Sequence, residues 1–127
     1  MEILTFEYLR YLQAHALVNI DYYINNNFVE DNKNLFFEKE ELKIILNLYA
    51  KMVSQGSWKD YSLIISNKQV GFSVFKNSSE NAKYKICKNF KPYNKYLKYL
   101  IIDSRGKILK NSDDLKILLN NINWKKI

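Results

Sequence analysis

The sequence is poor in the residues on which several kinds of chemistry depend. Among 127 residues it has one cysteine, one histidine, one proline and three glycines. Cys87 is alone and so has no partner for an internal disulfide, and together with His15 it provides no cluster of zinc-ligand spacing. The glycines, Gly56, Gly71 and Gly106, are too far apart to form a phosphate-binding loop or a dinucleotide fingerprint. We therefore expect no metal and no cofactor.

Long apolar segments are also missing. The longest uncharged stretch near the N-terminus, residues 11–20, is too short to span a bilayer and contains polar side chains. No basic segment leads into an apolar one there, so the sequence does not indicate a secretory signal. We expect a cytoplasmic protein, in keeping with its single cysteine, and no membrane among its partners.

Arginine is scarce as well, with two arginines beside 18 lysines. A genome rich in A+T would explain this ratio, and it weakens a nucleic-acid interpretation because arginine is preferred for bidentate phosphate and base contacts. Codon bias does not explain where the charges lie. Residues 1–50 carry four basic and eight acidic side chains, a net charge of −4, whereas residues 51–127 carry sixteen and five, a net charge of +11. The second half of the chain is therefore the part suited to an acidic partner.

Hydrophobic periodicity predicts one α+β folding unit. An amphipathic helix over residues 5–24 and a polar linker, together residues 1–34, precede an α+β domain over residues 35–127. A second helix is expected over residues 39–55, ended by Gly56, and a last helix follows a cap at Asn111 or Ser112. Strands are predicted over residues 58–65, 69–76, 83–88, 96–102 and 107–110. Short turns between them favour an antiparallel β-meander of four or five strands with helices packed on one face.

Several sequence blocks carry a family resemblance. They include Trp58-Lys59-Asp60-Tyr61, Phe72-Ser73-Val74-Phe75-Lys76, Ser79-Glu80 and Gly106-Lys107-Ile108-Leu109-Lys110. Over residues 35–119 the chain resembles domain-of-unknown-function family 2794, which is found in alphaproteobacteria. It departs from the family pattern at Ala50, where glycine is expected, and at Lys59, where arginine is expected. The resemblance implies an intact domain in a bacterial cytoplasm and brings no activity, cofactor or catalytic residue with it.

Two features could indicate catalysis, and each has a plainer interpretation. Asp60 and Glu80 could act as an acid–base pair, assisted by Ser79 or Tyr61, but Asp60 could equally fix the start of a strand and Ser79-Glu80 shape a turn. Cys87 lies among lysines that could lower the pKa of its thiol, but lysine is common in this chain. We expect a protein without catalytic residues.

The basic second half interleaves lysines with tyrosines. Lysines on a sheet can follow a phosphate backbone while exposed tyrosines stack on bases. The alternative is that Tyr84 and Tyr99 face the core and the lysines form an ordinary solvated surface. Our leading hypothesis is a noncatalytic binding module for nucleic acid or a nucleoprotein assembly. Its candidate residues are Lys83, Lys85, Lys88, Lys95, Lys98, Lys107, Lys110, Tyr93 and Tyr96.

The competing hypothesis is a protein-interaction or homodimerisation module. Ile44 and Leu48 lie outside the main apolar stripe of the second helix and widen its apolar surface. Such a helix needs two neighbours, and the second could be the N-terminal helix or another subunit. The acidic first half of one copy could also meet the basic second half of another.

Overall fold

The computed structural model describes residues 35–77 and 81–124. The predicted N-terminal helix and its linker lie outside these residues. Helix α2 spans Lys39–Ser54 and helix α3 spans Leu115–Asn120. The strands are β1 Asp60–Ile65, β2 Gln69–Phe75, β3 Tyr84–Asn89, β4 Tyr99–Asp103 and β5 Ile108–Ser112, with a short 3₁₀ helix, η2, over Lys95–Leu97.

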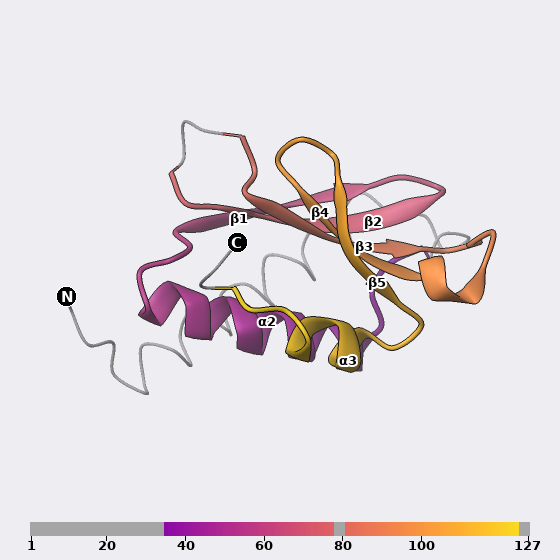
Figure 1. The fold of residues 1–127 in the computed structure, drawn as a ribbon, viewed down its shortest axis with the longest axis horizontal. Helices are drawn as coiled ribbons and strands as arrows, with labels where there is room; N and C mark the ends of the chain where they lie inside the picture. Colours follow the sequence, from indigo (N-terminus) through magenta and orange to yellow (C-terminus); the bar gives the residue numbers. More distant parts are fainter. Residues whose placement is uncertain (1–34, 78–80, 125–127) are drawn as a thin grey trace.

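The five strands form one antiparallel sheet in the order β1-β2-β3-β4-β5, which confirms the predicted meander. Figure 1 shows α2 and α3 on the same side of this sheet, which confirms the predicted arrangement of two layers. The register between β4 and β5 shifts between Ile101 and Ile102, so the edge strand carries an irregularity.

Local sequence explains where the helices begin and end. At the start of α2, Glu41 Oε1 accepts a hydrogen bond from the Glu38 backbone N–H at 2.6 Å, which satisfies one donor ahead of the first turn. The helix is followed by Gly56 with φ 75°, as predicted for a stop. The cap of α3 is Asp114, whose Oδ1 accepts from the Ile117 N–H at 3.0 Å. The predicted cap at Asn111 or Ser112 is wrong because β5 extends through Ser112.

The core lies between the sheet and the two helices. Alternate residues of the central strands, Val70, Phe72, Val74, Ile86 and Ile101, are fully buried beneath apolar side chains of α2 and α3. The residues between them, such as Ser73 and Cys87, occupy the outer face of the sheet, which is turned away from the helices.

Aromatic residues close the core at the β1 edge of the sheet. The ring of Tyr61 stacks on that of Phe72 with centroids 5.1 Å apart, and Tyr49 of α2 meets both rings edge-on. Trp58 is 1% exposed and packs edge-on against Trp124, with the ring centroids 5.3 Å apart. This cluster fixes α2 against β1 and β2.

Candidate functional site

Lys88 lies inside the protein, between the sheet and the start of α2. Its ammonium group donates to Glu41 Oε1 at 2.7 Å and to the Phe36 carbonyl oxygen at 3.3 Å. The other carboxylate oxygen of Glu41 accepts from the hydroxyl of Tyr99. Lys88 and Glu41 are each only 7% exposed. Lys88 therefore cannot contact a phosphate in the folded protein, and the interface predicted from the sequence loses this residue.

The electrostatics of the buried group formed by Glu41, Lys88 and Tyr99 indicate a structural role. Burial by itself would raise the pKa of Glu41, but hydrogen bonds from Lys88, Tyr99 and the Glu38 backbone outweigh it and lower that pKa. Burial, together with the hydrogen bond to Glu41, raises the pKa of Tyr99. At neutral pH the carboxylate is ionised and the phenol protonated, so the group joins α2 to β3 and β4.

Lys85 lies on the outer face of the same strand. An alanine Cβ at Gly71 would be 3.0 Å from Lys85 Cδ and 3.7 Å from Cys87 Sγ, so the lysine stem lies against Gly71 of β2. Cys87 is fully buried, and burial raises the pKa of its thiol to about 11, although the charge of Lys85 acts in the opposite direction. Such a thiol is protonated at neutral pH, which supports the interpretation of Cys87 as an incidental thiol.

The meander divides the remaining lysines between its two ends, because alternate turns of an antiparallel sheet lie at the same end. The β1–β2 turn and the β3–β4 connection share one end, where the Phe90 N–H donates to the Lys68 carbonyl oxygen at 3.0 Å. The β2–β3 loop and the β4–β5 turn share the other. The predicted lysines separate accordingly: Lys95 and Lys98 lie at the first end, Lys83 and Lys107 at the second, and Lys110 along β5.

A groove of about 480 Å³ lies at the first end, between the β1–β2 turn and the β3–β4 connection. Its shape is held by hydrogen bonds within the connection. Asn89 Nδ2 donates to the Leu97 carbonyl oxygen at 2.7 Å, and Asn94 Oδ1 accepts from the Tyr96 N–H at 2.9 Å to cap η2. Among the described residues, the lining contains two lysines and no carboxylate: Asn67, Lys68, Asn89, Lys91, Pro92, Tyr93 and Leu97.

The structure separates the tyrosines into core and surface residues. Tyr84 and Tyr99 are 3% and 6% exposed and belong to the core, in agreement with the plainer interpretation of the sequence. Tyr93 is fully exposed beside the groove, and Tyr96 is 51% exposed with Lys95 Nζ 4.9 Å from its ring centroid. We call the surface formed by Lys68, Lys91, Tyr93, Lys95 and Tyr96 the lysine–tyrosine end.

Two members of this end, Lys68 and Lys91, are absent from the candidate residues predicted from the sequence, and Lys68 is the one that lies far from them along the chain. It stands alone in the turn between two strands, outside the dense run of lysines from residue 83 onward. The order of the meander was the signal that could have found it. Once five sequential antiparallel strands are predicted, the β1–β2 turn must lie beside the β3–β4 connection, whatever the distance between them in sequence.

The positions shared with the family pattern that the structure describes have structural roles. Trp58 and Tyr61 belong to the aromatic cluster of the core. Asp60 is exposed, and its Oδ1 accepts from the Tyr61 N–H at 2.8 Å at the start of β1. Ser79 and Glu80 lie outside the described residues, so the predicted pairing of Asp60 with Glu80 stays a prediction.

Residues 35–119 match the model of a family described as protein of unknown function (DUF2794). The chain belongs to this family. The matched DUF2794 region contains the whole lysine–tyrosine end, the five strands and helix α2. No curated protein and no solved structure matches the chain.

Over residues 35–77 and 81–124, no group of three or more histidine, cysteine, aspartate or glutamate side chains could hold a metal ion. No helix in the same part of this DUF2794 chain combines the length and apolar character needed to cross a membrane.

Proposed function

We propose that this DUF2794 protein is a noncatalytic module that binds single-stranded nucleic acid, free or within a nucleoprotein assembly, through its lysine–tyrosine end. The observation that carries the proposal is Tyr93, which is fully exposed in the wall of a groove whose lining, over the part of the chain that the structure describes, includes two lysines and no carboxylate. An exposed aromatic ring gains no burial within its own fold, whereas it can stack on an unpaired base.

The charges around Tyr93 support the same partner. Lys68 and Lys91 belong to the groove, and the exposed Lys95 lies next to Tyr96. Together they provide three ammonium groups for phosphates beside two rings for bases. Such a surface tracks a flexible strand by charge and stacking and reads little sequence, because its described residues include no arginine and the amide of Asn89 already donates to the Leu97 carbonyl oxygen.

Fluorescence anisotropy with a labelled oligouridylate tests the proposal. If the protein neutralises about three phosphates of a single strand, the logarithm of the binding constant should fall with the logarithm of the salt concentration with a slope near −2. The affinity should then fall roughly 20-fold between about 50 and 200 mM salt. A duplex of the same length should bind more weakly because its bases are not free to stack. Absence of binding at low salt would refute the proposal.

Matched variants locate the surface. Tyr93→Ala should weaken binding on the order of 5- to 150-fold, since stacking contributes roughly 1–3 kcal/mol per base. Tyr93→Phe keeps the ring and should bind nearly as the parent does. Lys91→Ala should reduce the salt slope by about 0.7, the contribution of one phosphate contact. Lys107→Ala removes the same charge at the opposite end of the sheet and serves as the control.

The second proposal is a protein partner or a second copy of the chain. Ile44 and Leu48 are half-buried and pack against the core, so they offer less apolar surface than the sequence pattern predicts. Sedimentation equilibrium of the full chain at micromolar concentration tests self-association. A monomer with nucleic-acid affinity supports the first proposal, and a dimer whose dissociation follows Leu48→Asp supports the second.

A further inference from the structure

The two edge strands of the sheet, β1 and β5, differ in how they are protected. The outer backbone groups of an edge strand can pair with another strand, and native proteins block such pairing with lysines, bulges or proline. Strand β5 has two of these devices, since its register with β4 shifts between Ile101 and Ile102 and Lys110 lies within it. Strand β1 has neither, because it pairs regularly with β2 over its whole length and contains no lysine or proline. Strand β1 is therefore the edge that is open to a partner strand.

Hydrogen bonds in the sheet show which backbone groups of β1 point outward. Directly after β1, the Ser66 N–H donates to the Gln69 carbonyl oxygen at 2.9 Å, and in an antiparallel pair such bonds recur at every second residue. The residues whose N–H and C=O groups point away from β2 are therefore Tyr61, Leu63 and Ile65. In agreement, the Tyr61 N–H donates to the side chain of Asp60, at 2.8 Å from Oδ1, and not to β2.

Apolar side chains accompany these outward backbone groups. Tyr61, Leu63 and Ile65 are half-buried at the margin of the core. Ile64 lies on the outer face of the sheet and is 51% exposed. A strand added at this edge would cover apolar surface on both faces of the sheet in addition to binding the backbone.

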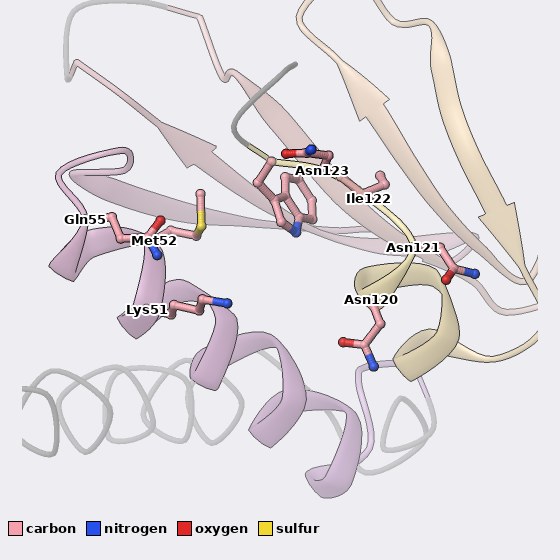
Figure 2. A pocket seen from close by; sticks show the side chains of 8 residues that line it. Lys51, Met52, Gln55, Asn120, Asn121, Ile122 and Asn123 are labelled. Carbon is pink, nitrogen blue, oxygen red and sulfur yellow. The ribbon is translucent and has the colours of Figure 1, made fainter.

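The hollow of about 420 Å³ between α2 and the residues after α3 suits a protein partner less well (Figure 2). Among the side chains that line it, Lys51, Gln55 and Asn120 are exposed and polar, whereas Met52 and Ile122 are buried. Little apolar surface is therefore open to a partner in this hollow, in contrast to the β1 edge.

We propose that β1 pairs antiparallel with β1 of a second copy of the chain, so that the two sheets continue into one across a two-fold axis. In a register centred on Leu63, the Leu63 residues of the two copies exchange backbone hydrogen bonds, and Tyr61 of each copy does the same with Ile65 of the other. A shift by two residues would leave some of these groups unpaired, so the edge is complementary to itself in one register. This inference rests on the second proposal above, since it requires self-association, but it uses a surface that does not include Leu48.

The charges at the ends of β1 fit the same register. Asp60 of one copy lies opposite Ser66 of the second copy and therefore next to Lys68, which follows in the β1–β2 turn. Because the two-fold axis repeats this arrangement, opposite charges meet at both ends of the β1–β1 interface. When the Tyr61 N–H binds the second copy, the Asp60 carboxylate that now accepts from it is released toward Lys68. Charge complementarity and backbone geometry thus favour a second copy over an unrelated strand.

Sedimentation equilibrium of the full chain, over about 10 μM to 1 mM, tests the interface, and the parent should dimerise with a Kd of about 100 μM or tighter. Ile64→Lys places a lysine on the proposed contact, as native edge strands do to block pairing, and should weaken the dimer at least about tenfold. Ile108→Lys is the matched control, because it makes the same change at an isoleucine that is 47% exposed on the β5 edge. It should leave the dimer unchanged.

Amide hydrogen exchange locates the interface within the strand. The N–H groups of Leu63 and Ile65 should exchange more slowly as the protein concentration rises, because the dimer hydrogen-bonds them. The Asn111 N–H, which points away from β4 at the other edge by the same alternation, should show no such dependence.

Two results would overturn the β1–β1 interface. The first is a chain that remains monomeric up to about 1 mM, which would also remove self-association from the second proposal. The second is a dimer that Leu48→Asp dissociates and Ile64→Lys does not, which would leave the second proposal standing and place its contact on α2.

Discussion

Replacing Lys88 by methionine is the substitution whose outcome the structure defines most sharply. The change removes the ammonium group that lies 2.7 Å from Glu41 Oε1 and 3.3 Å from the Phe36 carbonyl oxygen, and it keeps a side chain of similar length. The carboxylate of Glu41 then remains buried, and the donors left to it among the described residues are the Tyr99 hydroxyl and the Glu38 backbone N–H. Nothing on the surface of the protein changes.

We expect Lys88→Met to lower the free energy of unfolding by a large amount, because the Glu41 carboxylate stays desolvated after its ammonium partner has been removed. Removing one member of a buried ion pair typically destabilises a protein by about 3–5 kcal/mol. Whole domains are stable by only about 5–15 kcal/mol, so Lys88→Met should lose a substantial fraction of the free energy of unfolding. The double variant Glu41→Gln/Lys88→Met has no buried charge at this place and should be more stable than Lys88→Met alone.

Urea denaturation followed by tryptophan fluorescence measures these differences. Lys85→Met is the matched control, since it makes the same substitution three residues earlier in β3, on the outer face, where Lys85 is only partly buried. It should change stability by less than about 0.5 kcal/mol. If Lys88→Met also stays within about 0.5 kcal/mol of the parent, the ammonium group is not desolvated and the reasoning is refuted.

Three further outcomes follow from the described residues. The native pKa of Glu41 is lowered, so its ionised form contributes to the free energy of unfolding above the ordinary pKa of 4.5, and this contribution is lost as the pH falls below that value. Glu41→Gln should make the free energy of unfolding, measured by urea denaturation, depend less on pH in this acid range. An unchanged pH dependence would contradict the assignment. Cys87, buried with a pKa raised to about 11, should react with a thiol reagent only after unfolding, so rapid labelling of the native protein would contradict its burial. Asp114→Ala removes the α3 cap at the Ile117 N–H and should cost about 1 kcal/mol in thermal or urea denaturation, whereas Asp113→Ala next to it should cost little.

The order of the strands was predictable because each is short, alternating and joined to the next by a few polar residues. The residues at which the strands begin and end were not predictable to the same degree. Strand β4 was expected from residue 96 but begins at Tyr99, since residues 95–97 form a 3₁₀ helix that Asn94 caps through its side chain. A single cap of this kind competes with the strand pattern, and hydrophobic periodicity does not detect it.

The candidate site was predictable only in part, and Lys88 explains why. Alternation along β3 places Lys88 on the same face as Tyr84 and Ile86, which is the core face, so its burial could have been expected from position alone. Its counter-charge could not, because Glu41 lies 47 residues earlier in a different layer of the fold. Charge counted along a sequence therefore overstates the charge available on a surface, and pairing across layers removes part of it.

The most direct test of the central claim is a map of amide chemical-shift changes when a short oligouridylate is added to the ¹⁵N-labelled chain at low salt. The account predicts that the changes gather in the β1–β2 turn and the β3–β4 connection, with Tyr93 and Lys91 among the largest. Changes confined to the opposite end around Lys107, or no changes at all, would contradict it.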